Sequence, residues 1–252
     1  MGLHNSSISK GGLTMFPKTK TVHSNTSGLF SRFSKVHDML EVLPEKQGRV
    51  AMGLIMAAVV LFVTLALPAW AFGVAVGVLS VMMVRELGHM FKGKLPPLPI
   101  LLVVISALCL FFIRKEADVG HLFILYLIAV VSLNDSGAYL VGKRIGKRKL
   151  APQISPGKTI EGAAGGILVG TLGSILLFSI AGLPILLGLI SGAIIAVSAV
   201  AGDLYESKLK RMAGVKDSGT ALMHHGGFLD RYDSYLFAAP LLAFPLFILS
   251  LL

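Results

Sequence analysis

The sequence predicts an all-α, polytopic membrane protein built as a bundle of transmembrane helices. Its mean hydropathy is +0.79, and 54% of its residues are hydrophobic while only 14% are charged. A soluble domain carries about 25% charged residues, so this deficit indicates that lipid surrounds much of the chain. The charges also gather in short segments between long apolar runs. The single cysteine, Cys109, excludes a disulfide within the chain.

Seven apolar runs are long enough, or nearly long enough, to cross a bilayer, which takes about 20 residues as a helix. We predict spans at 50–67, 69–84, 97–113, 120–141, 163–181, 184–201 and 233–252, with a margin of one or two on the count. Pro68 marks a tight turn between the first two spans. The second span is short, so we expect it to be extended, tilted or incomplete, and we expect a loop to follow it at 85–96.

Basic residues predict the orientation of the bundle. The net charge is +10, and all lysines and arginines except Arg114 and Lys115 fall in segments that alternation places on one side. The positive-inside rule makes that side cytoplasmic. Clustering between apolar runs favours anionic lipid or an anionic substrate over nucleic acid as the partner.

The chain divides into a tail at 1–49 and a membrane-embedded domain at 50–252. We expect the tail to be basic, polar, cytoplasmic and flexible. It begins with many Ser and Thr residues and without acids, which leaves a transit peptide or a myristoylation signal open as alternatives.

A first polar segment begins inside the fourth predicted span. Asp135 lies there, and a carboxylate within a span is costly and generally functional or paired. The loop that follows, 142–162, combines many cations with glycine, proline and serine, which keep it non-helical and suit a polyphosphate. Its Gly157-Lys158-Thr159 run is no P-loop, because Pro152 stands at the required earlier glycine. An ordinary positive-inside loop would explain the cations but not Asp135.

A second polar segment follows the sixth predicted span. At 100° per residue, Asp203, Ser207 and Lys210 fall on one face of a helix, where they are poor material for a core. Asp230 and Asp233, three residues apart, share a face at the start of the last span. Helix capping by acids is the alternative explanation for this pair.

The aspartates of this segment predict a site for one or two Mg²⁺ ions. Mg²⁺ prefers oxygen ligands and typically binds one or two carboxylates together with substrate phosphates. Asp203, Asp230 and Asp233 could supply those carboxylates. Zinc is not expected, because the adjacent His224 and His225 lack a further ligand at helical spacing.

Both segments resemble the phosphatidate cytidylyltransferase (CDP-diacylglycerol synthase) family. In the second segment the resemblance rests on Ser207, Lys210-Arg211, Lys216-Asp217, His225-Gly226-Gly227 and Asp230-Arg231-Tyr232-Asp233. In the first it rests on Ala138-Tyr139, Gly142-Lys143 and the run from Ser155 to Gly162. Tyr232 departs from the family pattern, which usually has an aliphatic residue there.

The resemblance implies a membrane enzyme that transfers the cytidylyl group of CTP to phosphatidic acid, with Mg²⁺ as cofactor. Its catalytic residues would be Asp203, Ser207, Lys210, Asp230 and Asp233, of which Asp203, Asp230 and Asp233 would bind the metal. We expect the substrates to contact Asp135, Lys143, Ser155, Lys158, Glu161, Arg211, Lys216, Asp217, His225 and Arg231. We place the site on the cytoplasmic face of a bacterial inner membrane and leave a homodimer open.

Two other classes of function stay open. A related CTP-using enzyme could act on another lipid, such as an ether-linked phosphatidate or a polyprenyl alcohol. A transporter or a membrane scaffold is the alternative from outside the enzymes. A transporter should place ionisable residues or broken helices near the bilayer midplane. The first three predicted spans contain no charge and the polar motifs gather at one face, which favours an enzyme.

Overall fold

The polar motifs sit on a bundle of helices, shown by a computed structural model that describes residues 45–94, 96–116, 119–222 and 226–250. The elements in chain order are α2 (Glu45–Ala66), α3 (Ala69–Met90), α4 (Pro97–Lys115), α5 (Gly120–Ile145), β1 (Lys149–Ala151), β2 (Ser155–Thr159), α6 (Ile160–Ile180), α7 (Ile185–Met212), α8 (Leu229–Tyr232) and α9 (Tyr235–Ser250). Nearly all of the tail predicted at 1–49 lies outside the described residues, so its character stays a prediction.

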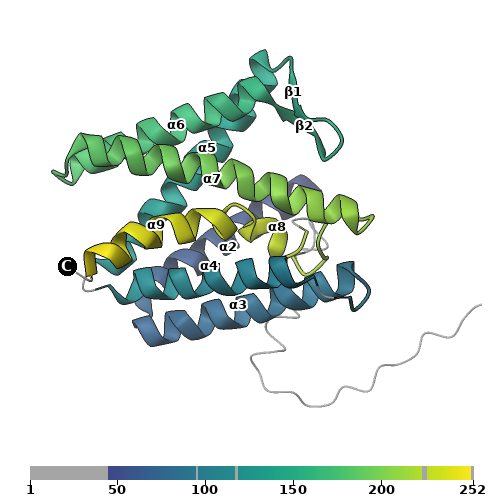
Figure 1. Cartoon of the computed structure of the whole chain (residues 1–252), viewed down its shortest axis with the longest axis horizontal. Coiled ribbons are helices and arrows are strands. Elements are labelled where there is room, and N and C mark those ends of the chain that lie inside the picture. The colour runs from purple at the N-terminus through teal and green to yellow at the C-terminus, as the bar shows by residue number, and fades with distance from the viewer. Residues whose placement is uncertain (1–44, 95, 117–118, 223–225, 251–252) are drawn as a thin grey trace, which may run out of the picture. The chain divides into compact units, whose positions relative to one another are not determined.

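A helix coincides with each of the seven predicted spans (Figure 1). Five of these, α3 to α7, are long and apolar enough to cross a membrane. The apolar parts of α2 and α9 are shorter, at Val50–Ala66 and Tyr235–Ile248. The prediction of an all-α, polytopic membrane protein is confirmed.

The second predicted span is extended, and its predicted end was wrong. Helix α3 continues to Met90 instead of ending at residue 84, so it includes Arg85 and Glu86. The sequence interpretation held that the first three spans contain no charge. Helix α3 shows that this is wrong, because it carries Arg85 and Glu86. Glu86 is buried on the same helix face as Met83, Leu87 and Met90, which is why a hydropathy window alone ends too early.

Proline and glycine set the turns between helices. Pro68 is extended at φ −63° and ψ 157° and separates α2 from α3, as predicted. At the end of α7, Gly214 adopts a φ of +72°, and Val215 N–H donates to the Lys210 carbonyl at 2.9 Å. Glycine tolerates this left-handed conformation, so α7 ends directly after the polar face that carries the motif.

Small residues let α5 and α6 pack closely. Gly166 of α6 faces α5, and a Cβ added there would lie 2.6 Å from the Asn134 carbonyl oxygen and 2.8 Å from Ala138 Cβ. Such close helix packing through small residues is typical of membrane proteins. It fixes the turn of α5 that carries Asp135.

The polar segments meet at one end of the bundle. Figure 1 shows the hairpin of β1 and β2, the end of α7, α8 and the α3–α4 turn at the same end, while the α6–α7 turn lies at the other. The loop 142–162 is non-helical at its centre, as predicted, but it forms an antiparallel hairpin that the sequence interpretation did not foresee.

Candidate active site

A polar cavity of about 580 Å³ opens at this end of the bundle. Residues from α5, α7, α8 and the segments on either side of α8 line it. Most of the lining is charged or polar, and the lining residues are Asp135, Asp203, Lys210, Asp217, Gly219, Thr220, Gly226, Asp230, Arg231, Asp233 and Ser234. The two segments singled out in the sequence therefore contribute to one cavity.

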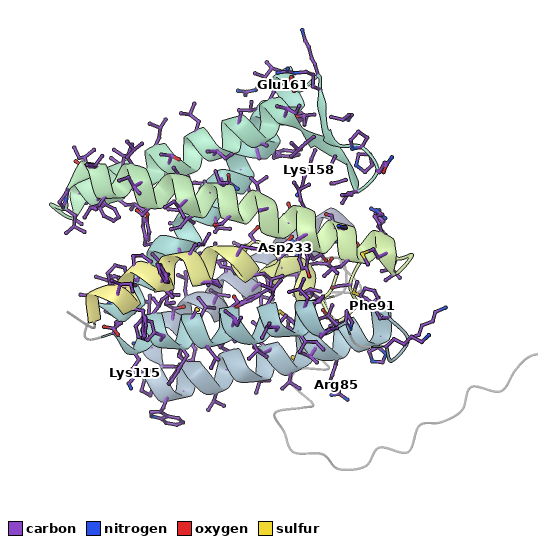
Figure 2. The ribbon with its side chains drawn as sticks, viewed as in Figure 1. Arg85, Phe91, Lys115, Lys158, Glu161 and Asp233 are labelled. Carbon is purple, nitrogen blue, oxygen red and sulfur yellow. The ribbon has the colours of Figure 1, made fainter. Side chains whose placement is uncertain are left out.

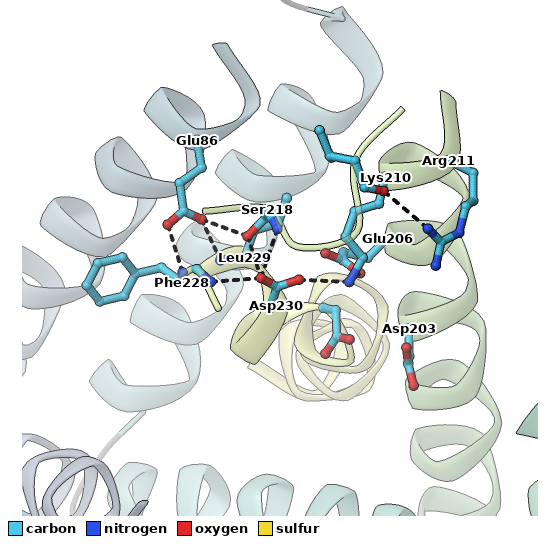
Figure 3. A network of polar contacts seen from close by, with 12 residues as sticks. Glu86, Asp203, Glu206, Lys210, Arg211, Ser218, Phe228, Leu229 and Asp230 are labelled. Atoms are coloured by element: carbon cyan, nitrogen blue, oxygen red, sulfur yellow. Dashed lines mark hydrogen bonds and ion pairs between the residues drawn. The ribbon is translucent and has the colours of Figure 1, made fainter. Parts of the chain in front are cut away.

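Asp230 is the centre of a bonded network, which we name the Asp230 hub: Glu86, Glu206, Lys210, Ser218 and Asp230 (Figure 3). One oxygen, Oδ2, accepts the Ser218 N–H and hydroxyl at 2.9 Å each and the Gly227 N–H at 2.7 Å. The other, Oδ1, accepts the Lys210 ammonium at 2.7 Å. These bonds fix the direction of the carboxylate.

The charge state of Asp230 follows from these contacts. Burial raises its pKa, but the Lys210 ammonium and the donated backbone N–H of Gly227 outweigh burial and lower the pKa to about 2. Asp230 is therefore a fixed anion at neutral pH. The bond from the Gly227 N–H to Asp230 resembles a helix cap. The contact with Lys210 is not part of a cap, so capping alone does not explain where Asp230 lies.

Lys210 lies between two carboxylates. Its ammonium is 2.7 Å from Asp230 Oδ1 and 2.7 Å from Glu206 Oε2, an ion pair at i,i+4 on α7. The Glu206 side chain has no exposed surface, and this ion pair lacks the angles of a hydrogen bond. The partly buried Lys210 ammonium is stabilised by the two carboxyl groups beside it. In return, Lys210 holds Glu206 and Asp230 next to one another.

The other carboxylates at the cavity form an acidic cluster: Asp135, Asp203 and Asp233. Gly202 allows α7 to approach, because a Cβ there would overlap the Asp233 carbonyl oxygen. Asp233 lies between α8 and α9, where burial and then the charge of Asp203 raise its pKa well above the usual range of an aspartate. Asp135 adds to the same effect. The acidic cluster therefore concentrates negative charge that favours a bound cation.

Lys158 connects the hairpin to the acidic cluster. It projects from β2 and forms an ion pair with Asp203 on α7, while Arg211 Nε of α7 donates to the Ile154 carbonyl at 3.1 Å. A second cavity of about 380 Å³ lies beside Lys158 and shares Asp135 and Asp203 with the first. The hairpin thus covers one side of the acidic cluster.

The structure places the remaining predicted site residues in different surroundings. Lys143 lines the second cavity, with its ammonium 5.6 Å from the centre of the Tyr139 ring. Asp217 and Arg231 line the first cavity, and Ser207 is buried within α7. His225 lies outside the described residues.

Ser155, Glu161 and Lys216 line neither cavity. Ser155 pairs with Ala151 in the hairpin, and Lys216 is exposed after α7. Glu161 accepts the Lys147 N–H at 3.0 Å and Arg148 Nε–H at 3.1 Å. Figure 2 shows Glu161 at the base of the hairpin, away from Asp233.

The donor set at the cavity is compatible with Mg²⁺. Among the described residues, no three histidine, cysteine or carboxylate side chains converge closely enough to hold a metal ion by themselves. Mg²⁺ usually needs only one or two carboxylates, because water and substrate phosphates fill its other positions. Asp203 and Asp233 line the same polar cavity, and the charge of Asp203 raises the pKa of Asp233. A bound cation would relieve this repulsion, so the pair would supply the two carboxylates that Mg²⁺ needs.

Sequence reasoning missed two acids of the Asp230 hub. Glu206 stands four residues before Lys210, a spacing that signals a helical ion pair. Glu86 stands three residues after Met83 on the apolar face of α3. An acid on an apolar stripe signals a buried partner. Both patterns are visible in the sequence, but they were missed because neither acid belongs to one of the two motifs.

Comparison with known proteins places the chain in a family. Residues 97–249 match the cytidylyltransferase family. The chain is 47% identical over 140 residues to the phosphatidate cytidylyltransferase of Bacillus subtilis (strain 168), covering 55% of this chain and 52% of that protein. It is 47% identical over 135 residues to the phosphatidate cytidylyltransferase of Staphylococcus haemolyticus (strain JCSC1435), covering 53% and 52%.

It is also 44% identical over 122 residues to the uncharacterized protein YnbB of Escherichia coli (strain K12), covering 48% of this chain and 41% of that protein. The chain spans about half the length of the curated relatives it matches. Because the family match includes both polar segments and more than half of the 252 residues, this chain belongs to the cytidylyltransferase family.

Proposed function

We propose that this protein is a phosphatidate cytidylyltransferase, which joins CTP and phosphatidic acid to give CDP-diacylglycerol and pyrophosphate. One observation carries the proposal: acids and cations from two distant segments line one polar cavity at the end of an apolar helix bundle. CTP is soluble and phosphatidate stays in the bilayer, so a reaction between them needs a polar site at the membrane surface. The names of two relatives support the same reaction.

The reaction needs positioning and charge compensation. A phosphatidate oxygen forms a bond to the α-phosphorus of CTP, and the bond from that phosphorus to the bridging oxygen of the β-phosphate breaks. Pyrophosphate leaves with the electron pair. The nucleophile is already an anion, so the protein mainly offsets repulsion between two polyanions and the charge on the leaving group.

Individual residues are proposed for these tasks. Asp203 and Asp233 would hold Mg²⁺, which would neutralise triphosphate charge when bound. Asp230, predicted from the sequence as a third ligand, would instead position Lys210, because its Oδ1 already accepts the Lys210 ammonium. Lys210, at the cavity wall, would contact phosphate. Lys216, predicted for the same task, is exposed and lines neither cavity. Lys158 and Lys143 line the second cavity, where they would capture CTP or the lipid headgroup.

The cytoplasmic orientation is part of the proposal. The hairpin and α7 are joined by the Lys158–Asp203 and Arg211–Ile154 contacts, so both segments must lie on one side of the membrane. Exposed positions at Gln153 and Lys216 can carry single cysteines in a Cys109→Ser background. An impermeant thiol reagent should label both from the cytoplasmic side of a bacterial inner membrane. Labelling from opposite sides would contradict a shared site.

The central test is turnover by purified protein with CTP labelled in the α-phosphate. Label should enter a lipid product only when phosphatidate and Mg²⁺ are both present, and excess chelator should abolish the transfer. An ether-linked phosphatidate and a polyprenyl alcohol serve as competing acceptors. Preferential labelling of the alcohol would contradict the proposed acceptor, and no lipid labelling at all would contradict the proposed reaction.

A further inference from the structure

We propose that Glu86 is a positioning residue: it anchors the loop that precedes α8 and thereby aims Asp230 at the cavity. This inference rests on the proposed function, because it concerns the same site. Glu86 belongs to α3, upstream of residues 97–249, which match the family. The role proposed for Glu86 therefore rests on its contacts in the folded protein and not on a sequence motif.

Glu86 binds the loop through three donors (Figure 3). Its Oε1 accepts the Phe228 N–H at 2.9 Å, and its Oε2 accepts the Leu229 N–H at 2.9 Å and the Ser218 hydroxyl at 3.1 Å. Only 8% of Glu86 is exposed. A buried carboxylate is tolerated where such donors replace water, so these bonds are the reason that α3 can carry an acid on its buried face.

The same short segment joins Glu86 to Asp230. The Ser218 hydroxyl lies 2.9 Å from Asp230 Oδ2, and Gly227, directly before Phe228, donates its N–H to the same oxygen. A hydroxyl has one proton, so Ser218 donates to one of the two carboxylates at a time. The donors that hold Asp230 Oδ2 are therefore themselves held by Glu86.

Two glycines, Gly219 and Gly227, lie close to the Glu86 carboxylate. A Cβ added at Gly227 would lie 2.6 Å from each Glu86 carboxylate oxygen, and one added at Gly219 would lie 2.9 Å from Oε1. The backbone at Gly219 and at Gly227 thus has little room to shift toward α3 while Glu86 is in place. Without that carboxylate, Oδ2 of Asp230 would lose its fixed donors, and Oδ1 would lose its direction toward Lys210 and the cavity.

The test compares Glu86→Gln with Glu116→Gln. Glutamine keeps the size of the side chain but offers an NH₂ group to one of the two backbone donors. Glu116 is the matched control, because it follows α4 at the other end of the bundle, beside Lys115 (Figure 2). Amide hydrogen exchange of peptides that cover 226–229 reports the anchoring directly. Steady-state pyrophosphate release with CTP and phosphatidate reports the positioning.

For Glu86→Gln we expect exchange in 226–229 to be about tenfold faster or more, since a charge-assisted bond is lost. We expect kcat to fall by about tenfold or more, with the KM of each substrate within about threefold, because the reacting geometry and not ground-state binding depends on Asp230. Glu116→Gln should match the unmodified protein in both measurements.

Two results would overturn the proposal: unchanged exchange, whatever happens to kcat, or faster exchange with an unchanged kcat. If Glu86→Gln does not fold, Gly219→Ala tests the same contact, because its added Cβ pushes Oε1 off the Phe228 N–H. That variant should show the same pair of effects. If the unmodified protein has no turnover, the proposed function fails, while the exchange experiment still decides whether Glu86 anchors the loop.

Discussion

The carboxylates at the polar end of the bundle lie in two regions with opposite surroundings. In the Asp230 hub, each oxygen of Asp230 is bonded by protein donors, and Lys210 lies between two acids. In the acidic cluster, Asp203 forms an ion pair with Lys158, and Asp233 accepts the N–H of its neighbour Ser234. The hub is held by the fold, whereas the cluster has bonding capacity left for a cation and its phosphates.

This difference separates two consequences of removing a carboxylate. A change in the Asp230 hub should affect both stability and activity, because protein groups lose their partner. A change in the acidic cluster should affect activity alone, because little of the protein depends on it. Four variants test whether the two regions differ in this way.

Asp230→Asn should give the largest combined effect. The amide NH₂ cannot accept the donors that now meet the carboxylate, and Lys210 loses one counter-charge. We expect about 1–3 kcal/mol of lost stability from the unmet charged bonds, seen as a lower unfolding temperature in detergent. Pyrophosphate release should fall by about 10²-fold. An unchanged unfolding temperature would remove Asp230 from the hub.

Asp233→Asn should lose comparable activity without losing stability. Its charge is repelled by Asp203 and Asp135, so a neutral side chain relieves the repulsion, and the asparagine oxygen can still accept the Ser234 N–H. We expect an unfolding temperature that is equal or higher, and about 10²-fold slower turnover from lost metal binding. A clearly less stable protein would show that the acidic cluster stabilises the fold.

Lys158→Met should have an intermediate effect. Lys158 is the cation of the hairpin that meets Asp203 and lines the second cavity, so its loss removes one charge-assisted contact to an anionic substrate. The KM for CTP or for phosphatidate should rise by about tenfold, and kinetics with each substrate varied in turn will show which one Lys158 binds. Unchanged values for both would leave Lys158 without a substrate role.

Glu161→Gln should have the smallest effect. Glu161 accepts the backbone N–H groups of Lys147 and Arg148 at the base of the hairpin and forms an ion pair with the Arg148 side chain, which is largely exposed. Exposed ion pairs contribute little because solvent screens them, so turnover should stay within about threefold of the unmodified protein. A loss as large as that of Asp233→Asn would restore the substrate contact that the family resemblance implied for Glu161.

The sequence predicted the helices well because hydropathy alone decides where a chain can cross lipid. Each of the seven spans fell on a helix. The boundaries were less secure, since α3 runs on through Arg85 and Glu86 to Met90. A charged residue ends a hydropathy window, yet buried donors can satisfy it inside the folded protein.

The site was predicted in part. The helical face of Asp203 and Lys210 and the later Asp230 and Asp233 do line one cavity, because periodicity fixes neighbours along a helix. The contact between Lys158 and Asp203 joins segments far apart in the chain, and only the family resemblance had grouped them. Nothing in periodicity could link Glu86 to Phe228, because that contact depends on how α3 packs in three dimensions.

Binding of Mn²⁺, measured by electron paramagnetic resonance as a paramagnetic substitute for Mg²⁺, tests the central claim that the acidic cluster holds a divalent cation. The unmodified protein with CTP present should bind Mn²⁺ saturably, and Glu161→Gln should bind it equally well. The double variant Asp203→Asn/Asp233→Asn should bind at least about tenfold more weakly, since Mg²⁺-type ions depend on such carboxylates. Equal Mn²⁺ binding by the folded double variant would show that the acidic cluster does not hold the ion.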